Sequence, residues 1–392
     1  MIFLKKKKLK KGVRKGIGVL LIALSVALIF CGINYSKIFE NKKQVIHEDI
    51  PKPVVEENAA SLIMVGDALI HGAIYDNVRS SGYDFKPIFS EVRNVFDDYE
   101  LKFYNQETIL GGTELGLSSY PQFNSPQQVG DAFMDMGFNL VSLATNHTLD
   151  RGVSTGWKTI QRSREYWNKQ ENVIAAGSYS TQEEKDKVIV KEVNGIKYGF
   201  LAYTTLTNGL VRPKGKDYYL DVYSNELAKK DIEKLKDKVD LLIVSMHWGI
   251  EYSNTACKEQ KDIAKYLSDL GVNVIIGTHS HVVQPIEFVG DTLVIYSLGN
   301  FISSQIGVEK LTGLVASIDI KKTTVDGKVS LELLNPKADL VYTCKPAICG
   351  KYKVYPYNKL TNNILPNYKN YYKKYMKIVR SLDNNIDTIY SK

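Results

Sequence analysis

The stretch GTHSH at residues 277–281 directly follows the largely apolar run Val272–Ile276. A short apolar run that ends at glycine is typical of a buried strand. On a strand His279 and His281 would point the same way, and on a loop both would reach one bound ion. Packing gives little reason for two histidines at such a place. The pair therefore predicts a metal site at the end of a buried strand.

The same arrangement repeats along the chain, because short apolar runs alternate with stretches of helical period. The predicted strands are 61–65, 101–104, 138–143, 197–203, 240–246, 272–277 and 293–297, and the predicted helices are Val129–Met136, Gly156–Gln170, Ser224–Lys238 and Glu259–Leu270. Strands that alternate with helices indicate an α/β protein. Beyond residue 312, two runs around Asp326-Gly327 predict a β-hairpin.

Histidine is rare in this chain, and its distribution is uneven. Only six are present. One lies in a polar segment near the N-terminus, and the others closely follow predicted strands: His71, His147, His247, His279 and His281. Carboxylates and amides follow strands in the same way: Asp67, Asn105, Glu107, Asn146, Asp150, Glu251 and Asn300. Sites in open α/β sheets form outside the carboxyl ends of the strands, so these side chains are predicted to meet.

Imidazole nitrogen together with carboxylate and amide oxygen suits Mn, Fe or Zn, and two divalent ions account for this number of groups better than one. Two adjacent ions clamp the attacking and leaving oxygens of a phosphate ester. The amide oxygen of Asn146 is predicted to bind metal, which leaves His147, with Asp150 nearby, to protonate a leaving group. Four further polar residues are predicted to contact substrate: Asn105, Glu251, Asn300 and His71.

Each of these residues also has a structural interpretation. Asp67 alone would serve as a helix cap. Asn146 and Asp150 alone would serve as turn residues. His247, beside Trp248, would be a hydrogen-bonded core histidine. Their joint occurrence at strand ends favours the metal site, or the remnant of one.

The N-terminus predicts a membrane anchor. Residues 1–15 carry eight basic side chains and no acid, which equals the net charge of +8 of the whole chain. The rest is therefore balanced, and nothing in the charge indicates nucleic acid as a partner.

Residues 16–34 form an apolar segment just long enough to span a bilayer, and its basic flank predicts a cytoplasmic N-terminus with the main domain outside the cell. A cleaved signal peptide and a lipoprotein at Cys31 are the weaker alternatives.

Segment composition divides the chain further. Residues 35–60 are polar, contain Pro51 and Pro53, and are predicted to be a linker. Residues 61–345 are predicted to form the main domain. Residues 346–392 are predicted to be a tail whose tyrosines, at helical spacing from Tyr368, form an amphipathic helix packed on that domain. An extracytoplasmic location would permit a Cys344–Cys349 disulfide, but the spacing fits two free thiols equally well.

Six motifs together resemble the CapA (PgsA) family of poly-γ-glutamate capsule biosynthesis proteins, from about residue 61 to residue 305. They are Gly66-Asp67, Asn105-x-Glu107, Thr145-Asn146-His147-x-x-Asp150-x-Gly152, His247-Trp248-Gly249-x-Glu251-Tyr252, Gly277-x-His279-x-His281-Val282-x-Gln284-Pro285 and Ser297-Leu298-Gly299-Asn300-Phe301. Members of that family are membrane-bound with the domain outside, and their ligase chemistry belongs to separate membrane subunits.

The family in turn resembles the calcineurin-like metallophosphoesterases, which implies a β-sandwich flanked by helices around a two-metal centre. By that resemblance Asp67 and His281 hold one metal, while Asn146, His247 and His279 hold the other. Glu107 bridges the two, and His147 is the general acid. The chain departs from the phosphoesterase pattern twice, and both departures affect the first metal. Leu69 stands in place of the usual histidine, with His71 two residues later, and Glu107 in an Asn-x-Glu context stands in place of the usual bridging aspartate after glycine.

Three functions follow as hypotheses. The first is a membrane-anchored accessory protein of poly-γ-glutamate synthesis or export, with the synthase subunits as partners. The second is an extracytoplasmic metal-dependent hydrolase of phosphate esters or of an envelope polymer, unrelated to a capsule. The third is a module that binds an anionic polymer without catalysis.

Overall fold

The computed structural model describes residues 23, 27 and 54–390. The predicted membrane anchor, residues 16–34, and most of the predicted linker lie outside the described residues. Among the residues that are described, no helix has the length and apolar character needed to cross a membrane. The folded part of the chain is a compact unit that begins at Val55.

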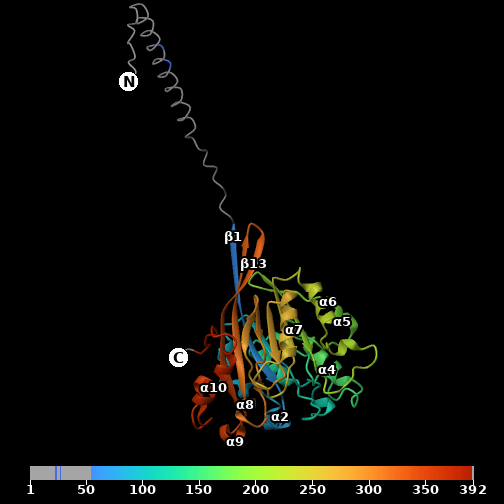
Figure 1. Ribbon diagram of the computed structural model, residues 1–392. Helices are drawn as coiled ribbons and strands as arrows, with labels where there is room; N and C mark the ends of the chain where they lie inside the picture. Colours follow the sequence, from blue (N-terminus) through green and yellow to red (C-terminus); the bar gives the residue numbers. More distant parts are fainter. Residues whose placement is uncertain (1–22, 24–26, 28–53, 391–392) are drawn as a thin grey trace, which may run out of the picture. The chain divides into compact units, whose positions relative to one another are not determined.

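Two sheets form the centre of this unit (Figure 1). In the first, the strands run in the order β14-β13-β12-β1-β2-β3-β4, and β11 pairs with β1; in the second the order is β5-β6-β7-β8-β10-β9. The strands are β1 (Val55–Ala68), β2 (Leu101–Asn105), β3 (Leu140–Ser142), β4 (Ile174–Ala176), β5 (Lys191–Val193), β6 (Ile196–Thr204), β7 (Leu241–His247), β8 (Val274–Thr278), β9 (Ile286–Val289), β10 (Thr292–Ile295), β11 (Asn300–Ile302), β12 (Thr312–Val325), β13 (Lys328–Cys344) and β14 (Lys353–Pro356).

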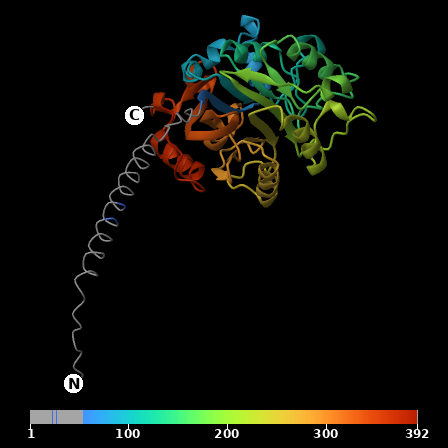
Figure 2. The same ribbon diagram turned by 90° about the horizontal axis from the view of Figure 1, so that it is seen from above.

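Helices cover the sheets, and Figure 2 shows them around the strands from above. They are α2 (Gly72–Asn77), α3 (Gln128–Asp135), α4 (Lys158–Trp167), α5 (Gln182–Asp186), α6 (Asn225–Leu235), α7 (Lys258–Asp269), α8 (Val308–Leu311), α9 (Pro346–Cys349) and α10 (Tyr368–Val379). The start of α6 illustrates the local cause of a boundary. The Ser224 hydroxyl accepts a hydrogen bond from the backbone N–H of Leu227 at 3.1 Å, which satisfies a donor that the first turn leaves unpaired.

Strand alternation explains why the two sheets stack. In β1, Leu62 and Met64 belong to a core cluster that also contains residues of the second sheet, such as Phe200 and Ile276. The intervening residues of β1 pack into a separate cluster on the outer face of the first sheet. A third cluster lies between the second sheet and helices α6 and α7. The result is a sandwich of two sheets with helices outside, as the resemblance implied.

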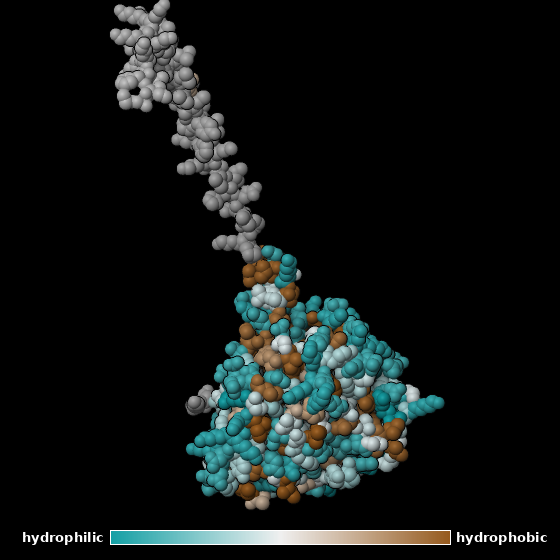
Figure 3. Space-filling view, viewed as in Figure 1, coloured by the Kyte–Doolittle hydropathy of each residue, from teal (hydrophilic) through white to brown (hydrophobic). Residues whose placement is uncertain are grey.

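Hydrophilic side chains cover most of the face seen in Figure 3, as burial of the apolar strand residues requires. The exposed apolar residues include a few on the projecting ends of β1, β12 and β13, namely Val55, Val325, Val329 and Leu334.

The structure changes two predicted boundaries. Strand β1 begins at Val55, so residues 55–60, expected in the linker, pair with β12 from Val55↔Val325 to Ala60↔Ile320. The reason is the length of the β12–β13 hairpin, which offers partners far beyond the apolar core.

Residues after 345 belong to the same compact unit as the main domain. Strand β14 pairs with β13, and the predicted tail helix is α10, whose residues Tyr375, Met376 and Val379 are buried. Cys344 and Cys349 form a disulfide.

Candidate metal centre

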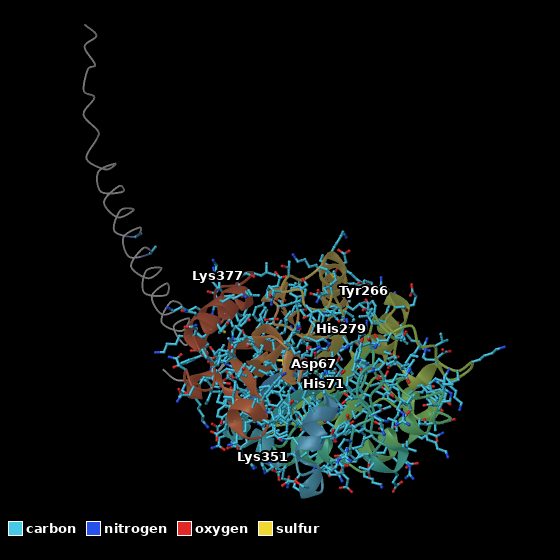
Figure 4. The ribbon with its side chains drawn as sticks, turned by 90° about the horizontal axis from the view of Figure 1, so that it is seen from below. Asp67, His71, Tyr266, His279, Lys351 and Lys377 are labelled. Carbon is cyan, nitrogen blue, oxygen red and sulfur yellow. A yellow bond between two sulfur atoms is a disulfide. The ribbon has the colours of Figure 1, made fainter. Side chains whose placement is uncertain are left out.

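The strand register brings the predicted ligands to one edge of the sandwich. Asp67 at the end of β1 lies beside Asn105 of β2 and Asn300 of β11. In the second sheet His247 at the end of β7 lies beside Thr278 of β8. Because parallel strands end on the same side, polar residues that are far apart in sequence converge. Figure 4 labels Asp67, His71 and His279 in this part of the molecule.

The GTHSH stretch has an unusual backbone. A Cβ on Gly277 would lie 2.0 Å from the carbonyl oxygen of Tyr296, so only glycine fits this close approach of β8 to the chain after β10. His279 and His281 both have positive φ values, 91° and 58°. Residues other than glycine adopt this left-handed backbone conformation at a cost of about 1–2 kcal/mol each. The surrounding fold holds both histidines in this conformation, and both are buried.

The first group of ligands consists of Asp67, Glu107 and His281. One donor atom from each lies within 4.8 Å of the others, and all three residues are buried. His281 Nδ1 lies 3.4 Å from Asp67 Oδ2, and His281 Nε2 lies 3.6 Å from Glu107 Oε1. The residues expected to hold the first metal are therefore together, with Leu69 in place of the additional histidine.

The second group consists of Asn146, His247 and His279. His247 Nε2 lies 3.0 Å from Asn146 Oδ1 and 3.2 Å from His279 Nδ1. Ligand atoms around one ion with bonds of about 2.1 Å are separated by roughly 3.0–3.4 Å. The separations within this group therefore suit three ligands of a shared ion. Its two imidazoles and one amide are also ligands that Mn, Fe and Zn accept.

Glu107 lies between the two groups. Its Oε1 is 3.6 Å from His281 Nε2 and 3.9 Å from His247 Nε2. Both carboxylate oxygens are buried without a hydrogen-bond partner among the described residues. A buried carboxylate without partners costs several kcal/mol unless a cation compensates it. This side chain therefore fits a bridging ligand between two ions, and the donor set as a whole fits a divalent metal pair.

The protonation states follow from burial. Burial lowers the pKa of His247 well below its usual value and that of His279 to about 3, so both rings are neutral and able to bind metal. Burial also lowers the pKa of His281, but the carboxylates of Glu107 and Asp67 outweigh it and raise this pKa to about 9. Burial raises the pKa of Glu107 well above its usual range, although the charge of His281 opposes the rise.

Two residues predicted to bind substrate are placed differently. Asn105 is fully buried, and its Nδ2 donates to Asp67 Oδ1 at 2.9 Å. Asn300 is also fully buried, and its Oδ1 lies 3.0 Å from His281 Nδ1. Both amides therefore position candidate ligands and do not face a substrate cavity. Position at a strand end could not distinguish these roles, because the carboxyl edge holds ligands and the residues that support them alike.

Sequence reasoning missed Thr278 altogether. Its hydroxyl lies 2.9 Å from His247 Nδ1, which leaves Nε2 of that ring toward Asn146 and His279. The available signal was its place within GTHSH, on a strand adjacent to that of His247.

The predicted acid lies beside the two groups. His147 Nδ1 lies 2.7 Å from Asp150 Oδ2, which also accepts a hydrogen bond from the backbone N–H of Phe123 at 2.7 Å. Burial raises the pKa of Asp150, although its hydrogen bond with His147 opposes the rise. The carboxyl thus fixes the orientation of the imidazole and leaves its Nε2 as the remaining ring nitrogen.

A cavity of about 490 Å³ opens beside these residues. Its walls include Asn146, His147, Asp150 and His281, together with His71 and Glu251, which were predicted to contact substrate. Other wall residues had no sequence signal that marked them: Tyr120, Pro121, Gln122, Phe123, Asn208, Leu210 and Gln305. Tyr252, from the His247 motif, also lines the cavity, and its ring centroid lies 5.9 Å from that of His281.

Comparison with known proteins places this centre in a family. Residues 61–305 match the family described as "Bacterial capsule synthesis protein PGA_cap", and this span exceeds half of the chain. The chain belongs to this family. The matched span contains all six candidate metal ligands of this chain, and it also contains His147 and Asp150.

Two curated proteins are similar to this chain in sequence. The "PGA biosynthesis protein CapA" of Bacillus subtilis is 33% identical over 172 residues, which cover 44% of this chain and 44% of that protein. The "Capsule biosynthesis protein CapA" of Bacillus anthracis is 26% identical over 314 residues, 78% of this chain and 72% of that protein. The match with the Bacillus subtilis protein therefore spans less than half of its length. Among solved structures, the calcineurin-like phosphoesterase YfkN from Bacillus subtilis is 16% identical, with a TM-score of 0.43 and coverage of 82% of this chain and 100% of that one.

Proposed function

We propose that this chain is the hydrolytic, membrane-anchored component of a poly-γ-glutamate capsule synthesis or export system. The names of the two relatives support the capsule role. One structural observation carries the hydrolytic part: Glu107 is buried without a hydrogen-bond partner between His281 and His247, a position that suits a bridge between two cations. The anchor is residues 16–34, with the domain outside the cell and the synthase subunits as partners.

Asp67, Glu107 and His281 would hold one divalent ion, and Asn146, His247 and His279 with Glu107 would hold the other. Such a pair, when bound, supplies Lewis acidity and stabilises charge on the attacking and leaving oxygens. The chain itself supplies positions and a proton. Asn105, Asn300 and Thr278 orient ligands. The cavity walls hold the substrate beside them.

The His147–Asp150 pair delivers the proton. Asp150 holds Nδ1 of His147, so a proton carried on Nε2 faces the cavity that both residues line. Transfer of that proton to the leaving-group atom neutralises it as the bond breaks. The backbone N–H of Phe123 binds the same carboxylate oxygen, and its ring lies edge-on to His147 at 4.7 Å. Both contacts restrict the movement of the pair.

The experiment compares strains and purified protein. A deletion strain is complemented with the natural gene, with His147→Gln or with Glu107→Gln, and surface poly-γ-glutamate is measured. We expect only the natural gene to restore the polymer. The purified His147→Gln variant should keep its metal content. Its rate of hydrolysis of a chromogenic phosphate ester should fall about 10²–10⁴-fold below that of the natural protein. Restoration by both variants would refute the hydrolytic role, and unchanged polymer in the deletion strain would refute the capsule role.

The size of the cavity favours a second candidate, a phosphate-ester hydrolase unrelated to a capsule. At about 490 Å³ it accommodates a small-molecule ester. The deletion strain separates the two functions. Under the second candidate, surface polymer is unchanged while the purified protein hydrolyses a chromogenic phosphate ester and His147→Gln does not.

A further inference from the structure

Positive charge is concentrated in one C-terminal segment of the folded unit. From Leu340 to Leu382 the sequence contains nine basic residues and no acidic one. Because the chain after residue 15 is balanced overall, the rest of it carries the compensating acidic excess. Two of the nine, Lys353 and Lys359, form ion pairs with Glu91, so the unpaired part of this charge lies mainly on and beside helix α10.

Helix α10 carries most of its basic residues on one side, with Lys374 outside that row. Tyr371, Tyr375 and Val379 pack against the core cluster of the two sheets. The basic residues Lys369, Lys373, Lys377 and Arg380 follow one another at intervals of three or four residues, so they form a single stripe. Intervals of four residues along a helix separate successive cations by about 6 Å. Figure 4 shows Lys377 on this helix, away from Asp67 and His279.

The stripe borders two hollows that meet. One of about 410 Å³ is lined by Lys369, Tyr372, Lys373 and Arg380, and by Asp339 and Tyr390. The other, of about 570 Å³, is lined by Tyr372, Lys373, Lys377 and Arg380 among others. Because the two hollows share Tyr372, Lys373 and Arg380, they form one groove. The α10 groove is defined here as Lys369, Tyr372, Lys373, Lys377 and Arg380.

The cations of the α10 groove lack close acidic partners among the described residues, although Arg380 interacts at longer range with the Asp339 carboxyl. Among the described residues, none of the four forms an ion pair. Arg380 donates to the carbonyl oxygen of Ile386 at 2.8 Å. Asp339 is the acidic residue in the wall, and burial raises the pKa of its carboxyl. A row of unpaired cations around a groove is complementary to a chain of anions.

We propose that the α10 groove binds a linear polycarboxylate, poly-γ-glutamate, along the helix axis. This inference rests on the proposed function for the identity of the polymer. A γ-linked glutamate repeat adds two methylenes to an ordinary peptide unit, so extended repeats place one carboxylate about every 6 Å. That interval equals the spacing of the cations along α10. One polymer segment therefore pairs with Lys369, Lys373 and Lys377 in succession.

The aromatic residues distinguish this ligand from a nucleic acid. Single-stranded nucleic acids bind by stacking bases on exposed aromatic faces. Three of the four tyrosines of α10 have ring neighbours within the protein: the ring centroid of Tyr375 lies 6.2 Å from that of Tyr371, and that of Tyr372 lies 6.0 Å from that of Tyr357. The groove is therefore marked mainly by its charges and hydroxyl groups, and competition by oligo-dT tests whether the half-buried ring of Tyr368 also stacks bases.

The groove and the metal centre flank the same short segment, α8 with Thr312. On one side, Asn300, which contacts His281, donates to the carbonyl oxygen of Lys310 at 2.8 Å. On the other side, the Thr312 hydroxyl lies 2.8 Å from the hydroxyl of Tyr357, a residue that lines the hollow. A polymer held on α10 is thus placed one segment away from the proposed hydrolytic centre.

The test is binding of fluorescently labelled poly-γ-glutamate to the full-length protein in a mild detergent, followed by anisotropy from 50 to 300 mM salt. The variant Lys369→Gln/Lys373→Gln/Lys377→Gln is compared with a matched control on the surface near α6, Lys230→Gln/Lys236→Gln/Lys238→Gln. We expect the α10 variant to bind at least tenfold more weakly. Its plot of log affinity against log salt should be less steep than that of the natural protein, because three cationic contacts that release counterions from the polymer are lost. The control should bind like the natural protein.

Three outcomes would overturn the proposal. They are equal weakening in the control, no binding by the natural protein at 50 mM salt, and equally strong competition from oligo-dT or from anionic lipid vesicles. Addition of EDTA separates the groove from the metal centre, because binding at α10 should survive the chelator. Loss of binding in EDTA would assign the polymer to the centre instead. Failure of the groove would leave metal content and the effect of His147→Gln unchanged.

Discussion

Glu107 is the residue on which both halves of the metal centre depend, because it contacts a histidine from each group. Two nearby side chains make hydrogen bonds around it. Asn105 donates to the carboxylate of Asp67, and the Thr145 hydroxyl donates to the backbone carbonyl oxygen of Glu107 at 2.9 Å. The carboxylate oxygens themselves have no hydrogen-bond partner among the described residues. We therefore expect the Glu107 side chain to act in the metal centre through its negative charge and not through hydrogen bonds to the protein.

The substitution Glu107→Gln tests this role. It keeps the shape and removes the charge, so we expect metal content, measured by inductively coupled plasma mass spectrometry, to fall by at least half. In EDTA the variant should be at least as stable as the natural protein, because burial disfavours the charged carboxyl. Glu114→Gln is the control, since the Glu114 side chain is 73% exposed. Full metal content in Glu107→Gln would exclude Glu107 as a ligand.

At the scale of elements, the end of β8 determines where two ligands lie. The backbone of Gly277 passes against the strand that ends before Tyr296, with the indole nitrogen of Trp248 also close. Immediately after it, the chain takes the two left-handed residues His279 and His281. Gly277 therefore sets how closely β8 approaches the chain at Tyr296, and the backbone two to four residues later sets the direction of the two histidine side chains.

The substitution Gly277→Ala should therefore affect stability and metal binding together. Its Cβ would lie 2.0 Å from the Tyr296 carbonyl oxygen, so β8 must shift, at a cost of about 3 kcal/mol or more. Urea unfolding and metal titration measure the two effects. Gly199→Ala in β6, where the nearest neighbour is a Leu235 methyl at 3.2 Å, should change each much less. Equal effects at both glycines would contradict the argument from close approach.

A buried charge cluster joins α5 to α6 and predicts a dependence of stability on pH. Lys185 Nζ lies 2.5 Å from Asp221 Oδ2 and 3.1 Å from Asp231 Oδ2. Burial raises the pKa of Asp221 to about 7, although Lys185 opposes the rise. The folded protein thus binds a proton at Asp221 that the unfolded chain, with a pKa near 3.9, releases earlier. The contribution of Asp221 is complete below about pH 4 and is lost as the pH rises through about 7.

Asp221→Asn should remove this dependence. We expect the free energy of unfolding of the natural protein to fall relative to that of the variant between about pH 4 and pH 7, by up to about 4 kcal/mol. Urea unfolding at a series of pH values measures the difference. If the free energies of unfolding of the two proteins changed with pH in parallel, Asp221 would have the same pKa in the folded and the unfolded state, and the prediction would be wrong.

At the scale of the whole molecule, the metal centre joins two sheets. Asp67 and Glu107 come from the ends of β1 and β2 in the first sheet, while His247 and His279 come from the ends of β7 and β8 in the second. The inter-sheet core and a few polar contacts, such as that of His247 Nε2 with Asn146 Oδ1 at 3.0 Å, hold these edges at the observed distances. Ions bound between them would add a link that the unfolded chain lacks.

Metal ions should therefore raise the stability of the entire domain. A ligand at 100 times its Kd stabilises the folded state by about 2.7 kcal/mol. We expect Mn²⁺ or Zn²⁺ to raise the Tm of the EDTA-treated protein by several degrees in one cooperative transition. The Glu107→Gln variant should respond much less. An increase of the same size in that variant would place the stabilising ions elsewhere on the protein.

The sequence by itself determined the alternation of strands and helices, the hairpin around Asp326-Gly327 and the positions of most candidate ligands. It could do so because period, turn chemistry and strand-end polarity are local properties. It placed the start of the domain at residue 61, since the polar residues Glu56, Glu57 and Asn58 of β1 show no apolar alternation.

Only the tertiary structure decided which polar residues face the cavity and which support the ligands. Asn105 and Asn300 differ from His71 and Glu251 in what surrounds them, and that depends on strand register and on contacts between distant segments. The same holds for the α10 groove. Its cations are visible in the sequence, but their stripe becomes a groove only where α10 packs on the β-sandwich and leaves two hollows beside Arg380.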